Sequence, residues 1–104
     1  MDACVVELRV LLARRLGDDF VRLYHYGSRL EGDAAPDSDY DVVCVTDRPL
    51  SREQIDGIID ASLDIQIAHE VVFDLHFFTE RELDSAPLSY TPFVQGLKER
   101  GVVV

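Results

Sequence analysis

The sequence predicts one small α/β (α+β) domain, residues 1–104, in which helices pack against a small mixed β-sheet. Three observations indicate this. A chain of 104 residues has room for one domain. Its 47% hydrophobic and 29% charged residues are typical of a globular protein. Helical and strand-like patterns follow one another in the order helix, strand, strand, helix, strand, helix, without an internal repeat or a linker.

Three segments have the features of helices. In residues 2–16 apolar side chains recur every three or four positions, and Gly17 follows as a helix stop. Residues 51–66 open on a serine followed three positions later by a glutamine, which is the pattern of a capping box. Residues 91–101 begin with threonine and proline, which suit the N-cap and N1 positions, and end with glycine. We therefore expect one long first helix, a second central one and a short last one.

Three further segments are expected to be strands. Residues 20–26 are rich in aromatic and branched side chains, and residues 70–78 alternate apolar and other side chains. Residues 39–46 contain the apolar run 42–45, which predicts a strand buried on both faces near the centre of the sheet. Between the first two strands, residues 30–38 are small, polar and turn-forming.

The charge and the apolar pattern limit the partners that we expect. The formal net charge is −10, and Lys98 is the only lysine, so nucleic acid is a poor candidate partner. No apolar run approaches the roughly 20 residues that span a bilayer, and the N-terminus lacks the order of a signal peptide. We expect a soluble cytoplasmic protein, with homo-oligomers left open. Cys4 and Cys44 are too few for a disulfide framework and are expected to be inert.

The segment 27–41 carries the features of a phosphate site. Gly27 lets the backbone approach a phosphate closely, and Ser28 offers both its N–H and its hydroxyl. Asp39 and Asp41 are two positions apart on an expected strand, so their carboxylates project from one face. Two adjacent carboxylates repel one another unless a cation lies between them, and a divalent ion bound to triphosphate oxygens meets that need.

Asp74 is the candidate third carboxylate. It is the only carboxylate inside the otherwise apolar third strand, and it joins Asp39 and Asp41 if that strand lies beside the second. Three such ligands fit a two-ion site for a divalent cation such as Mg²⁺, with a nucleoside triphosphate as substrate. In this hypothesis Asp39 and Asp41 bridge both ions, while Asp74 binds the ion at the acceptor and serves as general base.

The arrangement Gly27-Ser28, ten intervening residues and Asp39-x-Asp41 resembles the signature of the nucleotidyltransferase superfamily with the polymerase-beta fold. The chain length and the sequence around Gly27 resemble its minimal nucleotidyltransferase (MNT), antitoxin-like branch. That resemblance implies a metal-dependent enzyme that pairs with a helical HEPN-type toxin and transfers AMP from ATP to a tyrosine of the toxin. It also implies that Gly27, Ser28 and Arg29 bind the nucleotide and that Asp39, Asp41 and Asp74 are the catalytic metal ligands.

Other interpretations of the same residues were weighed. Asp37, Asp39 and Asp41 imitate an EF-hand loop, but Val42 stands where that loop needs glycine and Arg48 where it needs glutamate. The position of Arg29 fits a phosphate contact and an ion pair with a nearby acidic residue equally well. His25 and His76 have no metal-ligand spacing and are expected to be structural, with a role in supporting the metal ligands left open. A binding-only antitoxin with a vestigial site and a small-molecule, antibiotic-type nucleotidyltransferase remain alternative functions.

Overall fold

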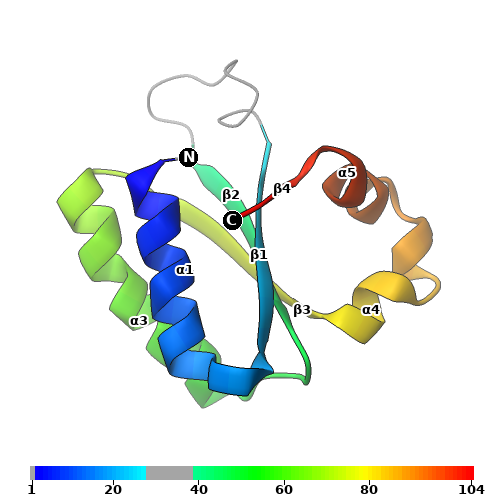
Figure 1. Ribbon diagram of the computed structural model, residues 1–104, viewed down its shortest axis with the longest axis horizontal. Coiled ribbons are helices and arrows are strands. Elements are labelled where there is room, and N and C mark those ends of the chain that lie inside the picture. The colour runs from blue at the N-terminus through cyan, green and yellow to red at the C-terminus, as the bar shows by residue number, and fades with distance from the viewer. Residues whose placement is uncertain (1, 28–38) are drawn as a thin grey trace.

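The computed structural model describes residues 2–27 and 39–104 and has the expected α/β architecture (Figure 1). A four-stranded mixed sheet lies between two sets of helices. In chain order the elements are α1 (Ala3–Leu16), η1 (Gly17–Asp19), β1 (Phe20–Tyr26), β2 (Tyr40–Thr46), α3 (Arg52–His69), β3 (Phe73–Thr79), α4 (Glu80–Asp84), η2 (Leu88–Tyr90), α5 (Pro92–Arg100) and β4 (Val102–Val103).

The strand order in the sheet is β3-β2-β1-β4. β1 runs antiparallel to β2 and to β4, whereas β2 and β3 are parallel. A parallel pair needs a long crossover connection, and α3 supplies it between β2 and β3. The expected central position of residues 42–45 is confirmed, because β2 is paired on both sides and these four residues are buried. β3 is an edge strand of the described sheet.

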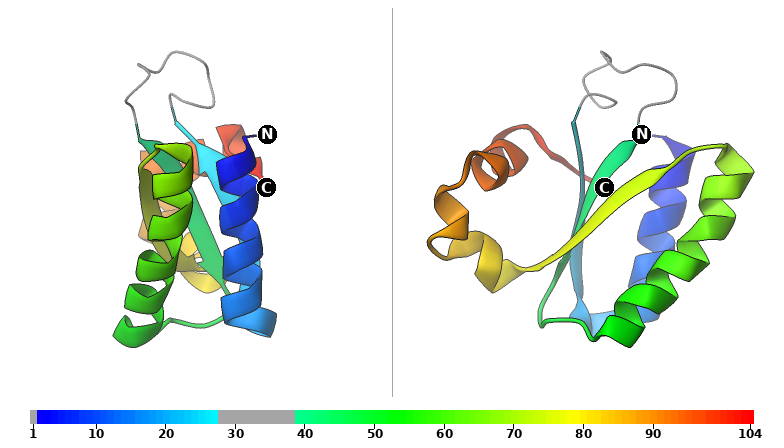
Figure 2. Two further views of the ribbon diagram at one scale, coloured as in Figure 1. Left: turned by 90° about the vertical axis from the view of Figure 1, so that its left-hand side faces the viewer. Right: turned by 180° about the vertical axis from the view of Figure 1, so that it is seen from behind.

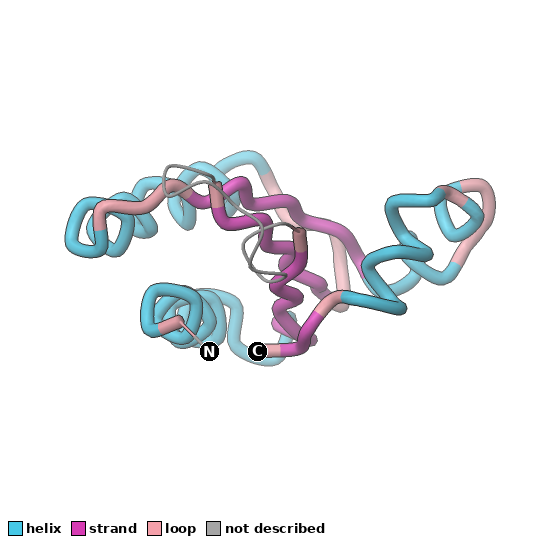
Figure 3. Tube along the Cα trace, turned by 90° about the horizontal axis from the view of Figure 1, so that it is seen from above, coloured by secondary structure: helices cyan, strands magenta, loops and turns pink. Residues whose placement is uncertain are grey.

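Helices lie on both faces of the sheet (Figures 2 and 3). One hydrophobic cluster on each face holds these layers together. The larger cluster joins α1 and α3 to one face, where Leu8, Leu12 and Leu23 are fully buried. The smaller joins α4 and α5 to the other face through residues such as Leu83 and Leu97. Because strand side chains alternate, neighbouring residues of β2 serve different clusters: Val42 the larger and Val43 the smaller.

The ends of the helices explain where the expected elements are right and where they differ. The capping box is confirmed: Gln54 N–H donates to Ser51 Oγ, and Ser51 N–H donates to the Gln54 side chain. α3 continues to His69 rather than Gln66, and Glu70 caps it in the left-handed conformation. The third strand therefore begins at Phe73, and the expectation that it starts at residue 70 is wrong.

Short elements near the C-terminus were not expected from the sequence. Thr79 and Glu82 form a second capping box, which starts α4 directly at the end of β3. β4 pairs with β1, and the N–H of Val104 donates to the carbonyl oxygen of Leu23. The expected last helix is confirmed as α5, with Thr91 as its N-cap. Among the described residues, no helix combines the length and the apolar character that crossing a membrane requires.

Candidate active site

Asp41 and Asp74 lie side by side at one end of the sheet. In the parallel pairing of β2 with β3, Asp41 is the direct partner of Asp74, and in the antiparallel pairing with β1 it is the partner of Tyr26. Residues that face each other across adjacent strands project from the same face of a sheet. The three side chains therefore form a row across β1, β2 and β3, on the face that α4 and α5 cover further along.

Gly27 closes this row at the end of β1. Its φ of 91° lies in a region that residues with a side chain rarely adopt. A Cβ atom at Gly27 would lie 2.2 Å from Asp41 Oδ2, and the next two closest atoms also belong to Asp41. The backbone of Gly27 is therefore packed against the carboxylate of Asp41. The predicted close approach of the Gly27 backbone to a phosphate stays a prediction, and the structure shows a close approach of this backbone to Asp41.

The electrostatic environment of Asp41 opposes its ionisation. Burial raises its pKa above the usual value, and the negative charges of Asp74 and Asp39 raise it further. A hydrogen bond to Asp74 acts in the same direction, whereas His76 partly offsets the shift. A partly buried carboxylate with another beside it is a place where a cation would be stabilised.

The three carboxylates are not equally placed. Asp39 is exposed and precedes β2, although its charge reaches Asp41. Within residues 2–27 and 39–104, no group of three or more His, Cys, Asp or Glu side chains is arranged closely enough to hold a metal ion. The described structure thus brings together Asp41 and Asp74 as a pair, with Asp39 at its margin.

Two predicted site residues, Ser28 and Arg29, lie outside the described residues, so the expected phosphate-binding turn is described only at Gly27. Both histidines were expected to be structural. His25 is buried at 3% exposure, and His76 Nε2 lies 3.2 Å from Asp74 Oδ1. His76 is therefore part of the surroundings of the acidic pair.

An aromatic cluster beside the acidic pair could not be found from the sequence. The ring of Phe93, from α5, lies 5.6 Å from that of Tyr26, 6.4 Å from that of His76 and 5.9 Å from that of Phe78. Burial and the charges of Asp41 and Asp74 raise the pKa of Tyr26 to about 12, so its hydroxyl stays protonated. In the sequence, only Tyr26 could be placed near the site, because it directly precedes Gly27. Phe93 comes from a distant helix.

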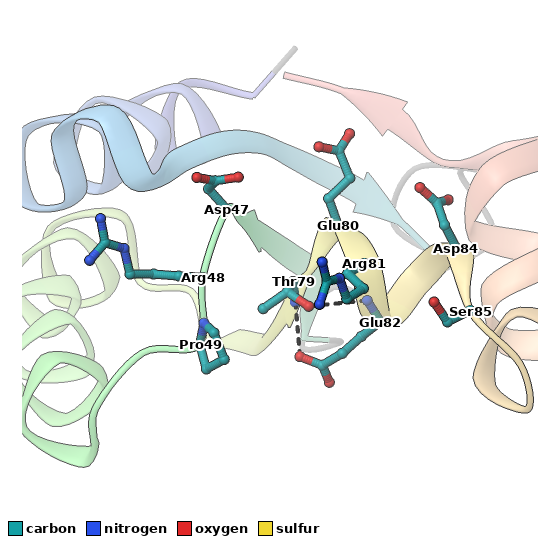
Figure 4. Close-up of a pocket in the computed structure, with 9 residues that line it drawn as sticks. All are labelled: Asp47, Arg48, Pro49, Thr79, Glu80, Arg81, Glu82, Asp84 and Ser85. Atoms are coloured by element: carbon teal, nitrogen blue, oxygen red, sulfur yellow. Dashed lines mark hydrogen bonds between the residues drawn. The ribbon is translucent and has the colours of Figure 1, made fainter.

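A cavity of about 850 Å³ lies at the opposite end of the sheet, where β2 and β3 end (Figure 4). Most charged groups around it already have partners. Glu82 caps α4 through Thr79, Glu80 accepts from Arg22 at 2.8 Å, and Asp84 accepts from Lys98. These charged side chains therefore stabilise the fold, and the close carboxylate pair of Asp41 and Asp74 is the better candidate for the active site.

The comparison with protein families identifies the class of protein to which the chain belongs. The profile of the nucleotidyltransferase domain matches residues 9–98, a segment that includes both strands of the acidic pair. The chain therefore belongs to the nucleotidyltransferase domain family, of the polymerase-beta-like superfamily. The mixed sheet with its helices is consistent with that fold, and the family indicates nucleotidyl transfer as the general activity. No curated protein matches the chain significantly.

Proposed function

We propose that this protein is a metal-dependent nucleotidyltransferase that moves AMP from ATP to a hydroxyl group of a protein partner. The observation that carries the proposal is the pairing of Asp41 with Asp74 on adjacent strands, directly beside Gly27. By its resemblance to the minimal, antitoxin-like branch, we propose a HEPN-type toxin as the partner and neutralisation of that toxin as the purpose.

The residues present suit a divalent cation of the Mg²⁺ type. Their donors are carboxylate oxygens, which hard cations prefer. The pKa of Asp41 is raised first by burial and then by the negative charges of Asp74 and Asp39, which a bound cation would offset. Asp39, Asp41 and Asp74 would hold the metal, with triphosphate oxygens and water as the remaining ligands. When bound, the ions would supply positive charge to the triphosphate and to the acceptor oxygen.

In the proposed reaction, the acceptor oxygen attacks the α-phosphorus of ATP. The new P–O bond forms as the bond to the β-phosphate breaks, and pyrophosphate leaves. Asp74 accepts the proton of the acceptor hydroxyl, since it lies on the edge strand and its side chain is 51% exposed. Gly27 and Ser28 hold the phosphates from the side of β1, where the backbone already approaches Asp41 closely.

The open placement of the acceptor side supports a protein acceptor over a small molecule. Asp39 is exposed, and half of the Asp74 side chain is accessible to solvent. Small ligands are usually bound in concave sites that bury most of their surface. A protein partner can cover an open site and bring its own hydroxyl group.

Intact-protein mass spectrometry of a purified partner tests this function. With ATP and Mg²⁺, the HEPN-type partner should become heavier by one AMP. Asp74→Ala should reduce the transfer while part of the ATP binding remains, whereas Asp39→Ala should remove both. Asp18→Asn, in the exposed part of η1, is the matched control and should transfer normally. If the mass of the partner never changes, and the Asp39→Ala/Asp41→Ala double variant still silences its activity, the protein is a binding-only antitoxin.

A further inference from the structure

The outer side of α3 carries an apolar row that nothing in the described structure covers. Its members are spaced by four residues, so they lie on one face of the helix. Their exposed fractions are high for large aliphatic side chains: Ile59 41%, Leu63 46% and Ile67 73%. The helix uses a different side within the domain, where Ile58 and Ser62 are buried.

An acidic row runs along α3 beside the apolar one. Asp56, Asp60 and Asp64 are exposed and also spaced by four. Each aspartate precedes one member of the apolar row by three residues, which makes the two rows neighbours on the helix surface. Asp56 pairs with Arg52 at 3.4 Å, but Asp60 and Asp64 have no ion pair in the described part of the chain.

The position of α3 links these rows to the candidate active site. The helix lies uncovered beside α1 on the outside of the molecule (Figure 2, left). Its last turn leads through a short connection into β3, the edge strand that begins at Phe73 and carries Asp74. Because α3 packs on the face of the sheet opposite to Asp41 and Asp74, a partner that lies along α3 reaches the acceptor side of the acidic pair around the edge strand β3.

We propose that these two rows of α3 form a docking surface for a basic amphipathic helix of a protein partner. The apolar row fits the apolar stripe of such a helix, and the free carboxylates of Asp60 and Asp64 select Lys or Arg beside that stripe. A second copy of this chain is a poorer occupant, because it also carries a net charge of −10. The identification of this partner with the acceptor protein rests on the proposed function, whereas the docking surface itself does not.

The test uses a synthetic 18-residue helical peptide with a leucine stripe flanked by lysines, and fluorescence anisotropy to measure its affinity. The control peptide has glutamate in place of every lysine. Leu63→Ser/Ile67→Ser should weaken binding of the basic peptide about tenfold or more, the range expected for apolar anchors. Val6→Ser/Val10→Ser is the matched control on α1, where the two valines are 42% and 40% exposed, and should leave the affinity unchanged.

Asp60→Asn/Asp64→Asn leaves the apolar row intact, and it should weaken peptide binding and reduce the salt dependence of that binding. Equal affinity for all variants, or equal binding of the glutamate peptide, would overturn the proposal. Self-association that Leu63→Ser/Ile67→Ser abolishes would also overturn it and assign the surface to a second copy. Because α3 contributes none of the proposed ATP-binding residues, the same variants should bind ATP with Mg²⁺ normally. If these variants lose peptide binding but AMP transfer to the partner stays intact, the docking surface is supported and its identification with the acceptor protein is refuted.

Discussion

The backbone of Gly27 and the carboxylate of Asp41 are in such close contact that no Cβ atom fits between them. A methyl group at Gly27 would lie 2.2 Å from Asp41 Oδ2. The contact joins the start of the expected phosphate-binding turn to the centre of the acidic pair. Glycine is thus required at position 27 for two separate reasons, the positive φ and the space that Asp41 occupies.

Gly27→Ala should therefore destabilise the protein more than an alanine substitution at a glycine where only backbone strain opposes it. Gly17 provides the matched control, because its φ is also positive, at 56°, but nothing lies within 4 Å of a Cβ atom there. We expect Gly17→Ala to lower the free energy of unfolding by about 1–3 kcal/mol from backbone strain. Gly27→Ala should lower it further and also abolish ATP binding. If Gly17→Ala and Gly27→Ala lower the free energy of unfolding in urea equally, and Gly27→Ala still binds ATP, the contact would be contradicted.

Asp41→Asn should stabilise the protein at neutral pH when no metal is present. Because burial and the charges of Asp74 and Asp39 raise the pKa of Asp41, the folded state binds more protons than the unfolded state above the ordinary value of 3.8. Wild-type stability therefore falls as pH rises through the raised pKa, and the variant avoids this loss. Melting temperatures should be higher for the variant at pH 7 and converge near pH 3. A lower melting temperature at pH 7 would show that Asp41 supports the fold.

His25 should lower the free energy of unfolding of the protein under mildly acidic conditions. Neither ring nitrogen of this buried side chain has a hydrogen-bond partner in the described structure, although its ring lies 5.5 Å from that of Tyr40. Burial lowers the pKa of His25 more than the charges of Asp2 and Asp41 raise it. Between the lowered pKa and 6.5 the unfolded state binds more protons, so the contribution of His25 to stability falls as pH decreases through that range.

His25→Phe keeps the aromatic ring and removes both unpaired polar atoms. Its free energy of unfolding should exceed that of the wild type by about 1 kcal/mol or more at pH 7, and by more at pH 5.5. The matched control is His76→Phe, since His76 is half exposed and paired with Asp74, and it should bring no such gain. If His25→Phe and His25→Leu both unfold more easily at both pH values, His25 has a required polar role.

Much of the fold could be predicted from local sequence, because its signals depend on neighbouring residues. The capping box of Ser51 and Gln54, the Thr91 cap and the apolar run 42–45 each act within a few positions along the chain. The late start of β3 was missed because α3 ends at Glu70, which adopts the left-handed conformation. Glycine or asparagine usually marks such a helix end in the sequence, and neither is present there.

The candidate site was predictable in its residue types but only partly in its geometry. The spacing of the aspartates indicated a carboxylate site, and the pairing of Asp41 with Asp74 confirms that the second and third strands are neighbours. The contacts of Phe93 with Tyr26 and His76 join residues far apart in sequence, so periodicity could not reveal them. The contact of Asp74 with His76 likewise depends on side-chain geometry that the spacing leaves open.

Calorimetric titration of the protein with ATP tests the central claim, that Asp41 and Asp74 form a metal-dependent nucleotide site. ATP should bind in the presence of Mg²⁺, and binding should disappear with a chelator and in Asp41→Asn. Asp74→Asn should retain part of the binding, and the control Asp60→Asn should retain all of it. Melting temperatures should rise with ATP and Mg²⁺ in the same variants that show heat of binding. Equal ATP affinity with chelator and with Mg²⁺, or undiminished binding by Asp41→Asn, would contradict the account.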